Sequence, residues 1–312
     1  MPWMTERGWR RCDKCQGLWF GDGPTSSCAA GGTHVQGGNE NFSLLQNSTT
    51  APGQSNWRWC SKCQSLWFGG GSNQGLCPAG GSHVRTNSGI YILSFNEGPG
   101  QRNWKWCGKC QGLWFGPNMP QSACVAGGQH SPSTTRSFRL LPVTTAVRIH
   151  TKVLALPSVS MQTMMENVRE VYALGGIDIE WLTNETLNLP ALADLHVGRC
   201  NLGTTTAEQN QLFKYRNGVR ANELAAYFVR STVIPVAGCA AHPVGKPGVV
   251  IARAAPPWSL AHEIGHVLGL SHVRNPRRLM TDAGTGNIVD LPPDLTASEI
   301  NTMVSSPYTH DV

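Results

Sequence analysis

Apolar and polar residues alternate over residues 147–153, which predicts a β-strand. From Ser160 onward the apolar period lengthens to that of an α-helix, and the pattern ends at Gly175 and Gly176. The apolar stripe of this helix consists of Met161, Met164, Met165, Val168, Val171 and Tyr172. A second alternating run at residues 177–181 follows, so this stretch predicts a strand, a helix and a strand in succession.

The same patterns predict further elements in the second half of the chain. Apolar runs indicate strands at residues 224–229 and 249–255. Thr296 and Glu299 have the spacing of a capping box, in which each side chain binds the other residue's backbone N–H, so a last helix is expected over residues 297–305. Cysteine and tryptophan become rare after about residue 141. We therefore expect one domain over residues 1–142 and another over residues 146–312.

The first domain contains a threefold internal repeat, with copies at about residues 9–46, 57–95 and 104–141. Each copy has about four strand-like runs separated by Gly, Pro, Ser and Asn. In the second copy these runs centre on residues 57–59, 66–68, the segment around His83, and residues 91–93. Three such copies predict a β-rich, β-trefoil-like closed unit, and the alternative is three separate zinc-binding beads on flexible tethers. The apolar strand that ends every copy favours the closed unit, because an isolated bead has no place to bury it.

Every copy of the repeat holds three cysteines and one histidine at constant spacing. The three sets are Cys12, Cys15, Cys28 and His34; Cys60, Cys63, Cys77 and His83; and Cys107, Cys110, Cys124 and His130. Four such ligands suit one tetrahedral structural zinc ion per copy. A disulfide framework is the alternative, but it leaves one thiol over in each copy and gives the histidine no role. Buried thiols without a metal are the third interpretation.

Charge adds a partner hypothesis for the first domain. Twelve Lys and Arg against five Asp and Glu give +7 for residues 1–141, and thirteen against fourteen give −1 for residues 142–312. A basic domain suggests an acidic partner such as a glycan, a cell envelope or nucleic acid. Each zinc ion with three thiolates adds −1, which lowers +7 to about +4. No dense basic run accompanies the aromatic residues, so nucleic acid is disfavoured, and a glycan or cell-envelope ligand is the sharper hypothesis. Most of the tryptophans are expected in the core.

The strongest chemical signal is the run HEIGHVLGLSH at residues 262–272. On a helix, His262 and His266 lie one above the other on the same face and can share a metal ion. Glu263 lies beside the first ligand, where it is placed to accept a proton from water. Gly269 lets the chain leave the helix and brings His272 round as a third ligand. Three histidines and one open position describe a catalytic zinc site.

This run, followed by RLMT at residues 278–281, resembles the motif and methionine turn of the metzincin zinc metallopeptidases. The resemblance covers about residues 258–282 and implies that the Met280 thioether forms a floor beneath the zinc site. It also implies an α+β zincin-like catalytic domain, with an edge strand at residues 233–242 along which an extended protein or peptide substrate docks. Asp282 stands where astacins and serralysins carry a tyrosine ligand, so no fifth ligand is expected and the branch stays open.

The resemblance implies a zinc-dependent endopeptidase with Glu263 as general base, one catalytic zinc ion and up to three structural ones. The first domain would then be a targeting or binding module. Two alternatives stay open: a glycan- or envelope-binding protein with an inactive peptidase domain, and a latent peptidase covered by its first domain. Cys200 and Cys239, the cysteines outside the repeats, form either a disulfide or two free thiols.

Localisation follows from what the sequence lacks and from the expected activity. No run of eighteen apolar residues exists, so a membrane span is not expected. The first seven residues do not include the apolar region of a secretory signal peptide. A free peptidase endangers its own cell, so we expect release or injection by another route, as an effector or toxin. Cytoplasmic residence is the alternative.

Overall fold

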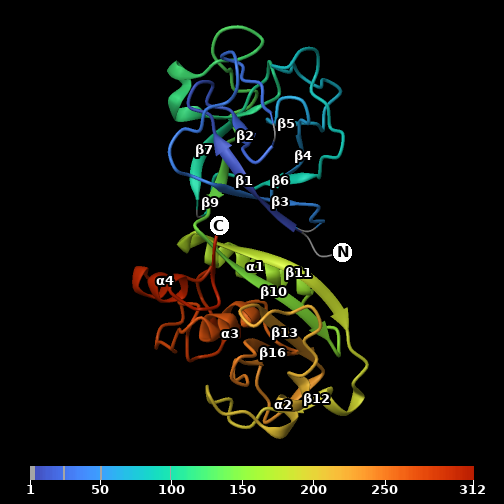
Figure 1. Ribbon diagram of the computed structural model, residues 1–312. Helices are drawn as coiled ribbons and strands as arrows, with labels where there is room; N and C mark the ends of the chain where they lie inside the picture. Colours follow the sequence, from blue (N-terminus) through green and yellow to red (C-terminus); the bar gives the residue numbers. More distant parts are fainter. Residues whose placement is uncertain (1–3, 24, 50, 99) are drawn as a thin grey trace. The chain divides into compact units, whose positions relative to one another are not determined.

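The computed structural model describes residues 4–23, 25–49, 51–98 and 100–312. These residues form two compact units, which we call the front unit, ending at Val143, and the back unit, from Thr144 to Val312. Each unit has a hydrophobic core of its own. Figure 1 labels strands and helices of both units. Among the described residues, no helix has the length and apolar character needed to cross a bilayer.

In the front unit, every copy of the repeat supplies three strands. These are β1 (Met4–Arg11), β2 (Leu18–Phe20) and β3 (Phe42–Gln46) in the first copy, β4 (Gln54–Trp59), β5 (Leu66–Phe68) and β6 (Tyr91–Leu93) in the second, and β7 (Gln101–Trp106), β8 (Leu113–Phe115) and β9 (Phe138–Pro142) in the third. The first strand of each copy pairs antiparallel with the other two. Strand β3 also pairs with β6 and β9, so the copies share one nearly closed, barrel-like sheet.

Four equivalent side chains from each copy meet in the core of the front unit. They are Trp9, Trp57 and Trp104; Leu18, Leu66 and Leu113; Phe42, Tyr91 and Phe138; and Leu44, Leu93 and Leu140. Each of these side chains is at most 2% exposed, as expected for aromatic residues that fill a core. Because all three copies contribute to one core and one sheet, the alternative of separate beads is wrong.

The structure corrects one of the strand-like runs predicted for each copy. The segment around His83 is a loop, closed by a 2.8 Å hydrogen bond from the Cys77 N–H to the Gly81 carbonyl. Gly80 and Gly81 have φ angles of 92° and 63°, in the left-handed region that glycine adopts without steric penalty. A backbone that turns this sharply cannot extend as a strand. The nearly closed, barrel-like sheet forms without this segment. The β-trefoil assignment stays a prediction.

The back unit is built on a mixed sheet. Its parallel strands are β10 (Thr145–Val153), β11 (Ile177–Thr186), β13 (Leu224–Val229) and β16 (Gly248–Ala252). The short strand β15 (Gly238–Cys239) pairs antiparallel with β16, and β17 (His310–Asp311) pairs antiparallel with β10. A separate parallel pair consists of β12 (Asp194–His196) and β14 (Ser231–Val233). Every residue of β13 and β16 is buried, as in a sheet that is covered on both faces.

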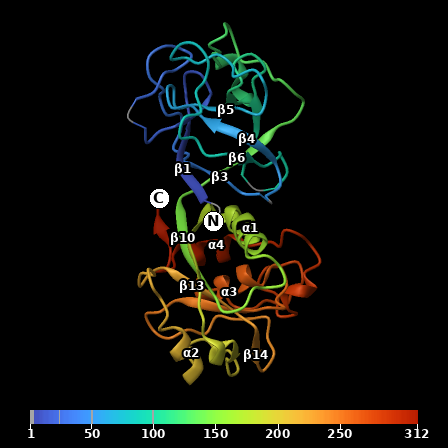
Figure 2. The ribbon, with the colours of Figure 1, turned by 90° about the vertical axis from the view of Figure 1, so that its right-hand side faces the viewer.

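Three of the four α-helices in the back unit confirm sequence predictions, whereas the helix at Ala207–Leu212 was not predicted. The four helices are α1 (Met161–Tyr172), α2 (Ala207–Leu212), α3 (Ser259–Val267) and α4 (Ala297–Val304), with short 3₁₀ helices η2 (Ala173–Gly175), η3 (Pro190–Leu192) and η4 (Thr285–Asn287); η1 (Gly116–Gln121) lies in the front unit. The Ser160 side chain caps α1, and the predicted capping box of Thr296 and Glu299 is present. Helix α1 packs on β11 and on α3 (Figure 2), whereas α2 lies beside β12 (Figure 1).

The predicted edge strand at residues 233–242 is only partly correct. The chain ends β14 at Val233, turns at Ile234, which has a φ of 64°, and continues through Pro235, which has no N–H to donate. Only β15 remains at the edge, beside β16. The predicted strand at residues 249–255 likewise ends early, at Ala252.

Candidate metal centres

Helix α3 carries His262, Glu263 and His266, and the way it ends brings His272 back to them. The Gly269 N–H donates to the His266 carbonyl at 3.0 Å, and the next N–H along the chain donates to the Gly265 carbonyl at 2.9 Å. This pair of bonds is a Schellman motif, which requires a left-handed residue. Gly269 supplies it with a φ of 101°.

The three imidazoles converge through their Nε2 atoms. The His272 Nε2 lies 3.1 Å from that of His262 and 3.0 Å from that of His266. On the far side of two rings, Nδ1 of His262 donates to the Leu279 carbonyl and Nδ1 of His266 to the Leu270 carbonyl, both at 2.8 Å. Protons held on Nδ1 leave the Nε2 lone pairs facing one point. Tetrahedral zinc with Zn–N distances of about 2.0–2.1 Å separates its nitrogens by about 3.3 Å, so the set fits the ion.

Burial favours the neutral form of His262 and His266. It lowers the pKa of His262 to about 4, against the opposing effect of the hydrogen bond to Leu279, and it also lowers the pKa of His266. Neutral imidazole is the form that binds a metal. His262 is buried, His266 is half-buried and His272 is exposed, so the metal position is open to solvent on the side of His272.

Glu263 lies on the same helix in a buried position beside β15. Burial raises the pKa of its carboxyl group to about 8, and a hydrogen bond with the backbone of Ala240 acts in the opposite direction. Gly238 makes room for this side chain, since a Cβ there would lie 2.5 Å from the Glu263 Cγ. A divalent cation bound nearby would favour the ionised carboxylate.

Met280 packs beneath the helix that carries the histidines. It is fully buried, and a Cβ on Gly265 would lie 2.7 Å from its sulfur. Its carbonyl accepts a 2.8 Å hydrogen bond from the N–H of Val273, directly after the third histidine. Met280 therefore supports both the helix and the loop that carries His272, and its contribution is structural.

A cavity of about 530 Å³ opens beside the histidines, within the size range of substrate sites. Glu263, His266 and His272 line one part, and residues 199–202 with Gly238 line another. Cys200 and Cys239 form a disulfide that ties this second wall to β15. Arg199 is the cationic member of this wall. Sequence patterns did not single out Arg199 or Gly238, because their place depends on the disulfide and on the order of the strands.

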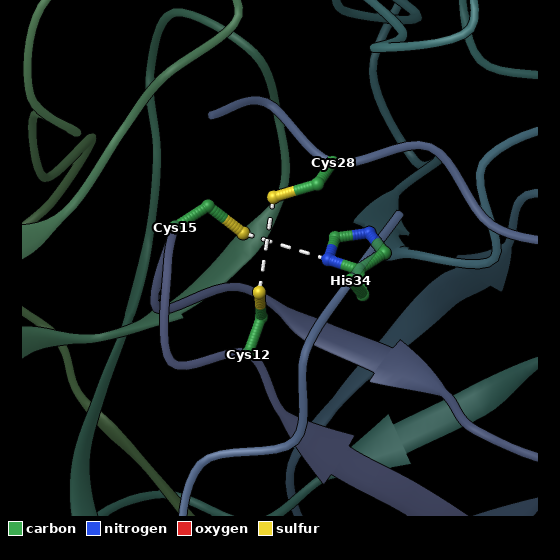
Figure 3. Close-up of side chains that lie close together, drawn as sticks. All are labelled: Cys12, Cys15, Cys28 and His34. Atoms are coloured by element: carbon green, nitrogen blue, oxygen red, sulfur yellow. Dashed lines mark hydrogen bonds between the residues drawn. The ribbon is translucent and has the colours of Figure 1, made fainter. Parts of the chain in front are cut away.

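The four ligand atoms of each front-unit set lie within 4.8 Å of one another. In the first set, the Cys12 and Cys28 sulfurs are 3.8 Å apart, and the Cys15 sulfur is 3.6 Å from the His34 Nδ1 (Figure 3). The corresponding distances are 3.8 and 3.5 Å in the second set, and 3.9 and 3.5 Å in the third.

These distances fit tetrahedral zinc. With Zn–S at about 2.3 Å and Zn–N at about 2.0–2.1 Å, the expected S···S and S···N separations are about 3.8 and 3.6 Å. A disulfide needs about 2.05 Å between its sulfurs, and all nine cysteines of the repeats are free thiols. The disulfide alternative is therefore wrong for the front unit. Hydrogen bonds with Cys15 and Cys28 lower the pKa of the Cys12 thiol, whereas hydrogen bonds with Cys12 and Cys28 raise the pKa of Cys15, so Cys12 is the sulfur that ionises first.

Two further contacts around the candidate zinc ligands recur in all three copies. In each copy the lysine between the paired cysteines donates to a glycine carbonyl of the loop that carries the third cysteine, at 2.6–2.7 Å. A tryptophan stacks on each histidine, with ring centroids 5.2–5.3 Å apart. The lysines were missed in the sequence, although their recurrence as Lys14, Lys62 and Lys109 was a usable signal.

Comparisons with known proteins find only distant structural similarity. No known protein family and no curated protein matches this sequence. Similar solved structures include metalloproteinase-II from Bacteroides fragilis, at 18% identity and a TM-score of 0.40, over 51% of this chain and 52% of that one. Archaemetzincin from Methanopyrus kandleri shows 15% identity and a TM-score of 0.34, over 51% and 93%. The zinc-dependent peptidase from Methanocorpusculum labreanum shows 15% and 0.34, over 50% and 99%.

These neighbours are zinc metallopeptidases by description, and this chain spans about half the length of the Bacteroides protein.

Proposed function

We propose that this protein is a zinc-dependent endopeptidase of the metzincin type, and that its front unit is a binding module held together by three structural zinc ions. One observation carries the first part of the proposal. The Nε2 atoms of His262 and His266 lie 3.1 and 3.0 Å from that of His272, beside the buried Glu263 and at the edge of a cavity of about 530 Å³. A binding protein with a degenerate peptidase domain is expected to have lost one of these groups.

The residues of the site divide the work of hydrolysis. His262, His266 and His272 would hold the ion, which polarises a carbonyl group and lowers the pKa of water to roughly 7. Glu263 would accept a proton from the attacking water and return it to the leaving amine. A carboxyl group whose pKa is near 8 before metal binding, and lower beside a cation, is suited to both transfers at neutral pH.

Substrate positioning would come from the edge of the sheet. Gly238 and Ala240 border the cavity, so a peptide lying there would run along β15 and the residue after it. Backbone groups at a sheet edge bind an extended chain regardless of its side chains. This arrangement favours internal cleavage of extended proteins.

Replacement of Glu263 by glutamine tests the proposal. Glu263→Gln keeps the size of the side chain but removes the base, so casein hydrolysis should fall by a factor of about 10²–10⁴ while zinc per chain stays constant. Glu97→Gln, at an exposed carboxylate of the front unit, is the matched control and should retain full activity. Hydrolysis that resists both a chelator and Glu263→Gln would contradict the mechanism. A zinc-loaded wild-type protein that cleaves neither casein nor end-blocked peptides would support the inactive alternative.

A further inference from the structure

The copies of the repeat meet at a small cavity in the front unit that has no role in the proposed peptidase chemistry. It is lined in part by the three histidines of the candidate metal sites and by three equivalent small residues, namely His34, His83, His130, Gly17, Ser65 and Gly112. Isolated strand bridges join the copies at the same small residues. The cavity therefore lies where the repeat closes on itself.

The histidine rings differ in how their outer nitrogens are satisfied. Each Nδ1 faces a cysteine sulfur, so a zinc ion there leaves the proton on Nε2. The His34 Nε2 lies 3.3 Å from the Ser65 hydroxyl of the next copy, and the His83 Nε2 lies 3.2 Å from the Cys110 carbonyl. The His130 Nε2 has no partner among the described residues, although the residue is only 7% exposed.

The space around Gly17 would allow a side chain that accepts a hydrogen bond from the His130 Nε2–H. Gly17 occupies in the first copy the position that Ser65 occupies in the second. A Cβ on Gly17 would meet the Cys15 sulfur at 3.4 Å and the Leu113 carbonyl at 3.8 Å, which are ordinary contacts. A serine there would supply His130 with a hydroxyl, as Ser65 does for His34. A buried donor without an acceptor destabilises a fold, so an acceptor from outside the chain is expected.

The size and lining of the cavity limit what that acceptor is. Its volume is about 30 Å³, whereas one water molecule needs roughly 10–15 Å³, so two or three non-hydrogen atoms fit. The mouth is apolar and is lined by Ala29, Pro78, Val125 and Leu76. The first three follow the third cysteine of each copy, and Leu76 is 47% exposed. No lysine, arginine, aspartate or glutamate is among the described lining residues.

We propose that this cavity binds the N-acetyl group of an amino sugar. An acetyl group has three non-hydrogen atoms, namely a carbonyl oxygen that can accept from the His130 Nε2–H, a carbon, and a methyl group suited to the apolar mouth. The sugar ring, bonded through its nitrogen, would lie across Pro78 and the exposed Leu76. This inference rests on the proposed role of the front unit as a binding module and gives that module a ligand class.

Depth favours a sugar over an acetylated peptide. An acetyl-lysine carries its acetyl group on a four-carbon stem, which needs a channel to enclose it. A cavity of about 30 Å³ ends after the acetyl group itself, so the attached part of the ligand must lie on the surface. A pyranose ring has apolar C–H faces that suit such a surface.

Binding of tri-N-acetylchitotriose to the full-length, zinc-loaded protein tests the inference. We expect saturation-transfer NMR to show the strongest contact at an acetyl methyl group, and calorimetry to show at least tenfold weaker binding of the deacetylated trimer. Gly17→Ser should place a hydroxyl group where it accepts from the His130 Nε2–H in place of the acetyl oxygen, and should weaken binding of the trimer at least tenfold, with zinc per chain and the unfolding temperature maintained. Gly71→Ser, in an open loop of the second copy, is the matched control and should bind like the wild type. Ala29→Phe, which blocks the mouth, is a second variant should Gly17→Ser fold poorly.

Several outcomes contradict the inference. Equal binding of both trimers removes acetyl recognition, and wild-type binding by both Gly17→Ser and Ala29→Phe places the ligand elsewhere. An acetyl-lysine peptide that binds where the sugar does not reassigns the ligand class. A cavity holding only water at millimolar trimer means that water satisfies His130. Casein hydrolysis by the same wild-type protein reports on the peptidase separately, so failed sugar binding with intact hydrolysis leaves the proposed enzyme in place.

Discussion

The two units use histidine in opposite ways. In the front unit, His34 presents Nδ1 to three cysteine sulfurs, and all four ligands are at least nine-tenths buried. In the back unit, His262 and His266 present Nε2, and the third ligand, His272, is exposed beside a cavity. Four protein ligands close a metal site, whereas three leave a position for a reactant. Under the proposed function, the front sites would therefore serve stability and the back site would serve chemistry.

Backbone geometry sets this difference. Two cysteines three positions apart on a tight turn, with two ligands from one loop, surround an ion from all sides. Two histidines on one helical face and one after the Gly269 turn approach the ion from a single side. The side of the ion that they leave free faces the cavity, which Gly238 and Arg199 also border.

Removal of one ligand from each kind of site should break the comparison most clearly. Cys63→Ser should lose one zinc ion and disorder the front unit, because structural zinc contributes on the order of 10 kcal/mol to folding. His266→Ala should also lose one zinc ion, but it should lower casein hydrolysis by roughly 10³ with little change in unfolding. Metal analysis and thermal unfolding measure both effects, and Ser61→Ala, in the same turn as Cys63, is the control. Equal destabilisation by both variants would end the distinction.

The pH dependence of unfolding in the metal-free protein tests the burial of Glu263 in the back site. Burial raises the pKa of Glu263 from 4.5 to about 8, so the contribution of this carboxyl group is fully present below pH 4.5 and is lost as the pH rises through 8. Glu263→Gln lacks this titration. After chelation, it should be more stable than the equally treated wild type at pH 8, by on the order of 2–5 kcal/mol, with no difference near pH 4.5. Denaturant unfolding at both pH values measures this, and a gap that does not change with pH would contradict the assigned burial.

The smallest expected effect concerns the open side of the back site. Arg199 is exposed on the wall of the cavity, so it should favour substrates with an acidic side chain near the cleaved bond. Arg199→Glu should change the preference between matched Asp and Lys peptides by about two- to fivefold, the scale of an exposed ion pair. Arg253→Glu, at an exposed arginine that does not line this cavity, is the control. Peptide competition assays decide the point, and an unchanged ratio would remove Arg199 from substrate selection.

Local patterns in the sequence predicted the parts of the fold that local forces determine. The Ser160 cap, the stripe of α1 and the capping box of α4 all appear in the structure, because each depends on residues within one or two turns. The shortness of β15 was not predicted, because it depends on one residue, Ile234, adopting a left-handed conformation that isoleucine rarely takes.

In the metal sites, too, the sequence predicted only what residues close together in the chain determine. The helix and the Gly269 turn bring the three histidines together within eleven residues, and the repeat places each Cys and His set within one copy. The cavity wall that includes Gly238 and Arg199 comes from strands and a disulfide that lie far from Glu263 in the sequence. No local pattern could therefore predict that these two residues border the site. The cavity beside His130 likewise arises only when the third copy meets the first.

The eleven cysteines require a defined order of maturation. Nine are free thiols grouped at the front sites, and two are joined in the Cys200–Cys239 disulfide. A thiolate that donates its electrons to a metal is a poor nucleophile toward disulfides, whereas an uncoordinated one exchanges readily. We therefore expect the nascent chain to take up zinc before it meets an oxidant; a chain oxidised first would form scrambled crosslinks in the front unit.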